Sequence, residues 1–187
     1  CANGLDAIEI GLRAQNIRTG DKVLTTPLSA FATTLAILRC GAIPVFVDVD
    51  EHGLMDLQKA EQALLADSSI RFMVPVHLYG HAMSLPNLAK LRDQFSLQMV
   101  EDCAQAIGAR SFGTQVGSAA QMAATSFYPT KNLGALGDGG AIVCNDSALA
   151  QKAQCLRDYG QSEKYLHTEL GLNSRLDELH AAILNAA

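Results

Sequence analysis

The sequence has 187 residues, of which 49% are hydrophobic, 18% charged and 5% aromatic, so it can bury a sizeable core and is too apolar for a disordered or fibrous chain. Its 14 basic and 19 acidic residues give a formal charge of −5 without long runs of one sign, which excludes the basic surface of a nucleic-acid-binding protein. The apolar runs are short and the first residues carry no basic segment, so we expect no membrane span, no secretory signal and a cytoplasmic protein.

Short β-rich runs alternate with longer helical stretches along the chain. In order, we predict a helix over Leu5–Gln15, a strand over Lys22–Thr26, a helix over Phe31–Arg39, a strand over Pro44–Asp48, a helix over Leu57–Leu65, a strand over Phe72–Val76, a helix over Leu85–Gln94, strands over Gln98–Asp102, Met122–Phe127 and Gly140–Cys144, and helices over Ser147–Arg157 and Ser174–Leu184. Asp56 stands where it can cap the helix that follows it. Several strands are nearly continuous apolar runs, as expected when helices cover both faces of a parallel sheet. The alternation predicts an α/β fold of three layers (αβα) with a mostly parallel, doubly wound sheet.

The two ends of the sequence fall at unusual places. It opens with Asn3-Gly4-Leu5-Asp6 directly ahead of a helix, and it closes inside the helical pattern of Ala181–Ala187. We therefore expect residues 1–187 to form a single large domain that is cut at both ends.

Lys131 lies in the most informative segment, Ser126-Phe127-Tyr128-Pro129-Thr130-Lys131-Asn132, which follows a predicted strand and precedes the glycine-rich run Gly137–Gly140. Open α/β sheets place their ligands at the carboxyl ends of strands, which is where this lysine falls. The alternative is a solvated surface lysine, because lysines are rarely buried.

Asp102 ends another apolar strand, in the segment Val100-Glu101-Asp102-Cys103-Ala104-Gln105. Taken alone, it is either a cap for the following turn or a buried counter-ion for a protonated ring nitrogen. Pyridoxal 5′-phosphate (PLP) needs a lysine that carries it as an imine and an acidic partner that keeps its pyridine nitrogen protonated. Lys131 and Asp102 together therefore favour a PLP site.

The sequence gives no pattern of metal ligands. Its five cysteines are far apart, without a C-x-x-C pair, which argues against a disulfide framework or a zinc site. His77 and His81 flank Tyr79-Gly80 without ligand spacing to any cysteine or acidic cluster, so we predict core or loop histidines and no metal.

The sequence resembles the DegT/DnrJ/EryC1/StrS family of sugar aminotransferases over essentially its whole length. The resemblance is carried by segments in the family's order: Gly4–Ala7, Pro27–Thr33, Pro44–Val49, Pro75–Gly80, Glu101–Gln105, Ser126–Asn132 and Asn173–Glu178. It implies the large PLP-binding domain of the fold-type I (aspartate aminotransferase-like) architecture. The implied reaction transfers an amino group from an amino acid, usually glutamate, to a nucleotide-linked keto-deoxysugar.

The resemblance also implies roles for the residues around the cofactor ring. Lys131 would hold PLP covalently and move a proton between substrate and cofactor carbons, and Asp102 would pair with the pyridine nitrogen. Gln105 would lie beside the phenolic oxygen, and Phe31 would stack on the ring face. The alternative for Phe31 is an ordinary core residue of its helix.

The phosphate is expected at the N-terminus of the first helix, where free amides and the helix dipole favour an anion. The resemblance assigns the amides of Gly4 and Leu5 and the hydroxyl of Ser126 to it, although the family commonly has Thr where this chain has Leu5. Asn173 falls in the family's Asn-x-Arg segment, which in relatives reaches across a homodimer to the partner's phosphate. The alternative for Asn173 is an N-cap of the last helix.

The residues also bear on three rival functions. Dehydratases of the family are expected to carry histidine where this chain has Lys131, which speaks against that activity, and other fold-type I reactions have no distinguishing residue here. A non-catalytic regulator is the rival from another class, and it is expected to carry a basic face or a DNA-reading helix. Neither is visible in the sequence.

Overall fold

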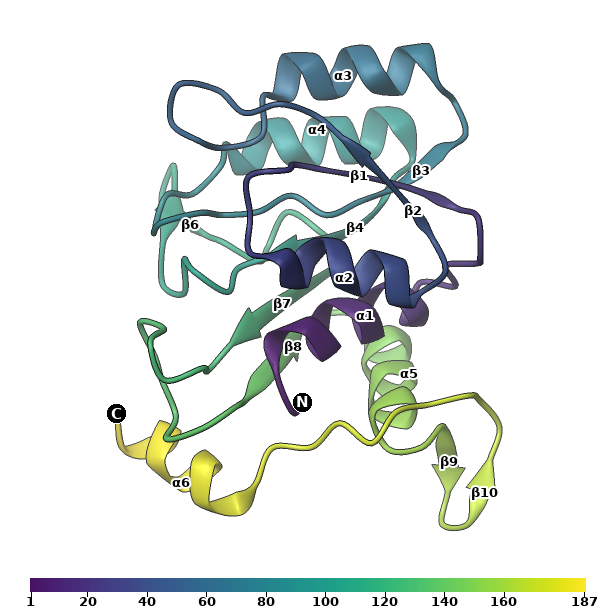
Figure 1. Cartoon of the computed structure of the whole chain (residues 1–187), viewed down its shortest axis with the longest axis vertical. Helices are drawn as coiled ribbons and strands as arrows, with labels where there is room; N and C mark the ends of the chain where they lie inside the picture. The colour runs from purple at the N-terminus through teal and green to yellow at the C-terminus, as the bar shows by residue number, and fades with distance from the viewer.

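A single six-stranded sheet organises the computed structural model, which describes residues 1–187 (Figure 1). The strands lie in the order β2 (Ile43–Phe46), β1 (Lys22–Thr25), β3 (Ile70–Met73), β4 (Gln98–Asp102), β7 (Met122–Ser126) and β8 (Gly140–Val143). Neighbouring strands are parallel except for β7 and β8, which pair antiparallel from Ala123↔Val143 to Ser126↔Gly140. The predicted α/β fold with a mostly parallel sheet is therefore confirmed.

The helices form a layer on each face of this sheet (Figure 1). One layer contains α1 (Gly4–Ala14), α2 (Phe31–Arg39) and α5 (Ser147–Arg157), and the other contains α3 (Leu57–Ala66) and α4 (Leu85–Phe95). Two small hairpins, β5 (Arg110–Ser111) with β6 (Thr114–Gln115) and β9 (Gln161–Glu163) with β10 (Leu166–His167), lie outside the main sheet, and α6 (Glu178–Ala186) is the last helix. No helix has both the length and the apolar character needed to cross a bilayer.

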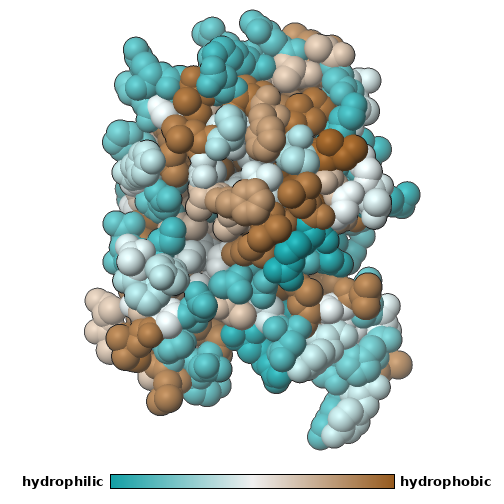
Figure 2. All heavy atoms as spheres, in the orientation of Figure 1, coloured by the Kyte–Doolittle hydropathy of each residue, from teal (hydrophilic) through white to brown (hydrophobic).

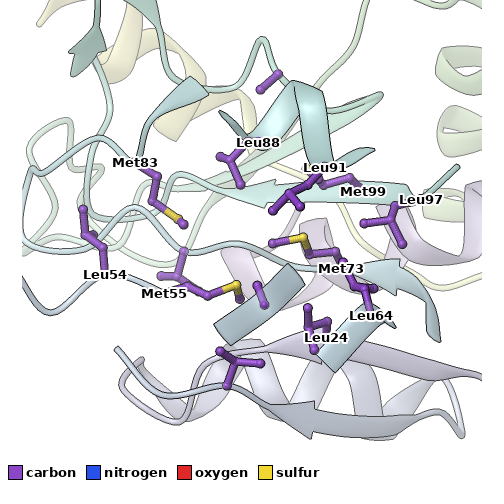
Figure 3. Close-up of a cluster of buried hydrophobic side chains, with 14 of the residues drawn as sticks. Leu24, Leu54, Met55, Leu64, Met73, Met83, Leu88, Leu91, Leu97 and Met99 are labelled. Atoms are coloured by element: carbon purple, nitrogen blue, oxygen red, sulfur yellow. The ribbon is translucent and has the colours of Figure 1, made fainter. Parts of the chain in front are cut away.

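Each face of the sheet has its own hydrophobic core. The core under α3 and α4 is rich in leucine and methionine, and Figure 3 shows its labelled members converging between the sheet and these helices: Leu24, Leu54, Met55, Leu64, Met73, Met83, Leu88, Leu91, Leu97 and Met99. The core under α1, α2 and α5 is built mainly from alanine, isoleucine, leucine and valine. Methionine side chains are flexible and fill irregular gaps, which suits them to the core under α3 and α4.

Two glycines let α1 lie unusually close to the sheet. A Cβ on Gly11 would stand 3.2 Å from Cγ2 of Val100, and a Cβ on Gly4 would stand 2.8 Å from Cβ of Ser126. Asn3 caps the helix, because its side chain accepts a hydrogen bond from the Asp6 amide at 2.8 Å. The N-terminus of α1 is thereby fixed against the carboxyl end of β7.

The last helix begins later than predicted, at Glu178 instead of Ser174. The backbone before it is extended, since the Leu172 amide donates to the Leu156 carbonyl at 2.7 Å and the Ser174 amide donates to the Arg157 carbonyl at 2.9 Å. These bonds tie the segment to the end of α5 and prevent it from continuing the helix. The alternative assignment of Asn173 as the N-cap is therefore wrong, and Asp177 occupies that position.

Large apolar side chains are exposed around α2 and β2: Leu28, Phe31, Leu38, Ile43 and Phe46. Figure 2 shows an apolar area in the middle of the face that carries α2 and β2. We call these five residues the α2–β2 apolar surface. Apolar areas of this kind mark interaction sites more often than isolated exposed side chains do.

Candidate functional site

A cavity of about 340 Å³ lies where the N-terminus of α1 meets the carboxyl ends of β4 and β7. Among its lining residues are six of those predicted from the sequence: Gly4, Leu5, Asp102, Gln105, Ser126 and Lys131. Ligands of open α/β sheets bind at this end of the strands. The fold thus brings together residues that are up to 127 positions apart, from Gly4 to Lys131, in one place.

Lys131 follows β7 in a turn that is closed by its own amide, which donates to the Tyr128 carbonyl at 2.8 Å. Its half-buried side chain lines the cavity and makes no ion pair or side-chain hydrogen bond in the chain. Its positive charge acts on the Asp102 carboxyl, whose pKa it lowers against the larger opposing effect of burial. An unpaired amine in a cavity is a suitable nucleophile or base once it loses its proton.

Asp102 is 5% exposed and has a defined partner on each carboxylate oxygen. Oδ2 accepts from Thr33 Oγ1 at 2.8 Å, and Oδ1 accepts from the Ala104 amide at 3.0 Å. Burial raises the pKa of Asp102 above its ordinary value, although these two hydrogen bonds and the charge of Lys131 act in the opposite direction. Its bond to Ala104 supports a turn, so the predicted capping role and a place in the cavity coexist. A cationic ligand would offset the free-energy cost of keeping the buried Asp102 carboxylate ionised.

Glu101, the preceding residue, is buried away from this cavity and fully bonded. Its Oε2 contacts His77 Nε2 at 2.9 Å and accepts from the Gly117 amide at 2.8 Å, while Oε1 accepts from the amides of Ala119 at 2.8 Å and Ala120 at 2.7 Å. Burial alone would raise the pKa of Glu101, but the His77 bond and the backbone donors outweigh it and hold the pKa below its ordinary value. This carboxylate therefore anchors the segment that leads into β7.

His77 is completely buried, as predicted for a core histidine, whereas His81 is exposed in a loop. The Nδ1 of His77 accepts from the Met83 amide at 3.1 Å, so the ring proton lies on Nε2 and is donated to Glu101. Ligand atoms of His77, Glu101 and Cys103 lie within 4.8 Å of one another. Both nitrogens of the imidazole are already hydrogen-bonded, and burial raises the pKa of the Cys103 thiol, so these groups act as a structural network.

The N-terminus of α1 offers the cavity two free backbone donors. The amides of Gly4 and Leu5 have no hydrogen-bond partner in the chain. Ser126 Oγ accepts from the Tyr128 amide at 3.3 Å, which leaves the hydroxyl proton of Ser126 available to donate. Together with the helix dipole, these donors suit a bound anion.

The side chain of Gln105 is oriented by the backbone of the segment after β3. Its Oε1 accepts from the Tyr79 amide at 3.3 Å, so its side-chain amide nitrogen is the free group. That nitrogen is a donor, which fits a ligand oxygen.

Two predicted site residues are not among the lining residues of the cavity. Phe31 is the first residue of α2 and is 67% exposed, so the alternative of an ordinary helix-core residue is wrong. Its neighbours Ala30 and Ala32 do line the cavity. Asn173 is exposed on the extended segment before α6, where its Oδ1 accepts from Arg175 Nε at 2.9 Å.

Among the residues that line or support the cavity, sequence reasoning missed the polar residues Ser29, Thr33 and Arg39. Ser29 precedes α2 and Thr33 lies in its first turn, and the two hydroxyls are 2.7 Å apart. Their partner Asp102 is distant in sequence and gives no local signal. Arg39 lines the cavity while its guanidinium forms ion pairs with α1, to Glu9 at 2.7 Å and to Asp6 at 3.3 Å.

The chain is similar over residues 1–187 to the DegT/DnrJ/EryC1/StrS aminotransferase family, as the sequence resemblance predicted. A "Pleiotropic regulatory protein" of Geobacillus stearothermophilus is 45% identical over 185 residues, which are 99% of this chain and 50% of that protein. A UDP-N-acetyl-3-dehydro-alpha-D-glucosamine 3-aminotransferase of Acidithiobacillus ferrooxidans is 44% identical over 187 residues, 100% of this chain and 50% of that protein.

Solved structures agree with this match. The crystal structure of S. venezuelae DesV in complex with a ketimine intermediate has a TM-score of 0.94 and 43% identity, and the match covers 99% of this chain and 50% of that chain. The present chain therefore spans about half the length of the curated relatives that it matches.

Proposed function

Since the chain belongs to the DegT/DnrJ/EryC1/StrS aminotransferase family, we propose that it forms the cofactor site of a PLP-dependent transaminase. The reaction moves an amino group from an amino acid, with glutamate as the expected donor, to a nucleotide-linked keto-deoxysugar. The observation that carries the proposal is the shared cavity of Lys131 and Asp102, which also receives the unpaired amides of Gly4 and Leu5.

The residues fit PLP at three chemically distinct points. The free amides of Gly4 and Leu5 and the Ser126 hydroxyl suit the phosphate. The buried Asp102 carboxylate, whose pKa is raised by burial, suits a cationic ring nitrogen. The unpaired Lys131 amine suits an aldehyde. When bound, PLP supplies an electron sink that makes a proton on the substrate carbon removable.

Lys131 acts in this scheme as the group that accepts and returns that proton. It must be neutral to do so, because only an unprotonated amine has a lone pair that can accept a proton. Asp102 stays ionised beside the ring nitrogen, and Gln105 donates its free amide N–H to the phenolic oxygen. Phe31, at the edge of the cavity beside Ala30 and Ala32, covers the ring face after its side chain turns inward.

Asn173 is proposed to act in the cavity of a second copy within a homodimer. It lies outside the lining of its own cavity, and Arg175 fixes its amide so that the Nδ2 donor remains free for an anion. Arg175 is in turn held by Tyr159, since its Nη2 donates to the Tyr159 hydroxyl at 3.2 Å. The α2–β2 apolar surface gives further support for a protein partner.

A regulator without catalysis is less well supported, even though one relative bears a regulatory name. A purely regulatory protein has no need of an unpaired lysine beside a buried carboxylate and an anion-binding helix end. The presence of lysine at position 131 also favours transamination over the dehydratase reaction, in which the family resemblance expects histidine.

The test begins with the complete protein, PLP and the Lys131→Ala variant. The wild type should develop a visible imine band on addition of PLP and lose it on addition of glutamate, while Lys131→Ala should show neither change. A panel of nucleotide-linked keto-sugars, analysed by mass spectrometry, should then give an aminated product only with the wild type. A wild type that binds PLP in solution but leaves glutamate and every keto-sugar unchanged would refute the transaminase assignment.

A further inference from the structure

A buried hydroxyl group stands behind the Asp102 carboxylate. Thr33, in the first turn of α2, is completely buried, and its Oγ1 lies 2.8 Å from Asp102 Oδ2. Ser29 Oγ lies 2.7 Å from the same Thr33 oxygen. Ser29 is itself a lining residue of the cavity, so the row of three groups begins and ends at the cavity.

The charge of Asp102 fixes the direction of these hydrogen bonds. An ionised carboxylate can only accept, so Thr33 must donate its single hydroxyl proton to Asp102. The Thr33 oxygen is then an acceptor, and Ser29 must donate to it. All three groups are therefore ordered for as long as Asp102 is ionised.

Thr33 and Ala104 hold the carboxylate from two separate elements. The Ala104 amide bonds Oδ1 from the turn after β4, whereas Thr33 bonds Oδ2 from α2. Two donors on two oxygens fix the plane of the carboxylate as well as its position. Hydrogen bonds to an ionised acceptor are roughly twice as strong as neutral ones, so α2 contributes directly to the geometry of the site.

We propose that Thr33 is a positioning residue, supported by Ser29, which holds the Asp102 carboxylate ionised and in the orientation needed by a cationic ligand. The identification of that ligand as the PLP ring nitrogen rests on the proposed function. The hydrogen-bonded row itself does not depend on the cofactor. Besides Thr33 and Ala104, the charged and titratable groups that act on Asp102 are Lys131 and His77.

Thr33→Val removes the hydroxyl and keeps the shape of the side chain, so it isolates the hydrogen bond. Thr33→Ser keeps a hydroxyl and should therefore keep the hydrogen bond to Asp102. Thr34→Val is the matched control, because Thr34 is the next residue of α2 and makes no side-chain hydrogen bond. We expect Thr33→Val to weaken PLP binding by about tenfold or more, which is the scale of a hydrogen bond to a charged group. Thr33→Ser and Thr34→Val should stay within about twofold of the wild type, and Ser29→Ala should lose about two- to threefold.

The second measurement follows the unfolding midpoint of the same variants against pH without PLP. Thr33→Val should lower the midpoint most at the high-pH end of the range, where Asp102 is ionised, and the loss should shrink on acidification as Asp102 becomes protonated. Thr33→Ser should follow the wild type across the whole range. This comparison contains no cofactor, so it decides the role of Thr33 even if the protein proves to bind no PLP.

The proposal is overturned if Thr33→Val shows the same loss at every pH, because a purely structural role would be independent of the charge of Asp102. It is equally overturned if Thr33→Ser fails to rescue, or if Thr34→Val has as large an effect. A wild type that fails to bind PLP, while Thr33→Val keeps its pH-dependent loss, would refute the proposed function and support the positioning role.

Discussion

Glu101 and Asp102 are adjacent carboxylates on the same strand, both nearly inaccessible to solvent, yet their surroundings differ in kind. Glu101 contacts four donors, one from His77 and three from backbone amides, and its pKa is held below the ordinary value. Asp102 has two protein donors, and burial raises its pKa. Successive residues of a strand point to opposite faces. The Glu101 carboxylate is therefore bonded inside the protein, whereas Asp102 lines the cavity.

The difference shows how burial alone fails to identify a functional carboxylate. A buried charge that the protein itself satisfies is part of the scaffold. A buried charge that remains under-compensated beside a cavity is a candidate for ligand binding. Substitution of each carboxylate should therefore affect a different property of the protein, stability for Glu101 and ligand binding for Asp102.

Replacement of Glu101 should damage the fold more than any other change near the site. Glu101→Leu leaves the His77 ring N–H and three backbone amides without an acceptor, and loss of one member of such a buried network typically costs about 3–5 kcal/mol. Denaturant unfolding of the purified variant should show this loss in its midpoint. A loss below about 1 kcal/mol would contradict the scaffold role of Glu101.

In contrast to Glu101→Leu, Asp102→Asn should have a small effect on stability and a large effect on PLP binding. Removing a charge whose pKa is raised by burial should leave the unfolding free energy within about 1 kcal/mol of the wild type. PLP affinity should nevertheless fall by about tenfold or more, because an amide cannot neutralise the ring nitrogen. Parallel denaturant and PLP titrations measure both quantities. The assignment of Asp102 to ligand binding fails if the variant unfolds early but binds PLP normally.

The two carboxylates should also leave opposite signatures in stability against pH. The pKa of Glu101 is lowered on folding, so its contribution is present above its ordinary value and is lost as pH falls through the folded value. The pKa of Asp102 is raised, so its contribution is present at acid pH and is lost as pH rises through the folded value.

Unfolding midpoints of Glu101→Gln and Asp102→Asn, measured across the acid range, should therefore diverge. Glu101→Gln should flatten the acid loss of stability expected of the wild type, and Asp102→Asn should make that loss steeper. Parallel curves for the two variants would show that the difference between the two sites is not electrostatic.

The smallest expected effect lies at the phosphate end. Leu5→Thr should place a hydroxyl beside the free amides at the N-terminus of α1, and one added hydrogen bond should tighten PLP binding by about two- to tenfold. Leu5→Val is the matched control, because valine has the branched shape of threonine but lacks its hydroxyl. Equal affinities for the two variants would show that position 5 does not face the phosphate.

Local sequence signals accounted for most of the fold. The predicted helices Phe31–Arg39 and Ser147–Arg157 match α2 and α5 at both ends, and Asp56 caps α3 as predicted by accepting from the amides of Gln58 and Lys59. The hairpins β5–β6 and β9–β10 were not predicted, since their strands have only two or three residues and most of these are polar or charged. The late start of α6 also escaped prediction, because bonds to the end of α5 override a helical pattern.

The shared cavity was predictable where a candidate residue lies at or after the end of a strand, as for Asp102 and Lys131. It was not predictable where function depends on pairing between distant segments. Nothing near Thr33 in the sequence indicates Asp102, and nothing near Glu101 indicates the amides of Gly117 or Ala120. The exposed position of Phe31 was likewise invisible, because an aromatic residue at the start of a helix fits a core and a cavity edge equally well.

The central claim is that Lys131 is the residue that binds the cofactor covalently, and chemical trapping tests it most directly. The protein should be mixed with PLP, reduced with borohydride, digested and mapped by mass spectrometry. We predict that the label falls on Lys131 and not on the five other lysines of the chain, and that Asp102→Asn lowers its yield at limiting PLP. A label on another lysine, or equal labelling of Lys131→Ala, would contradict the account.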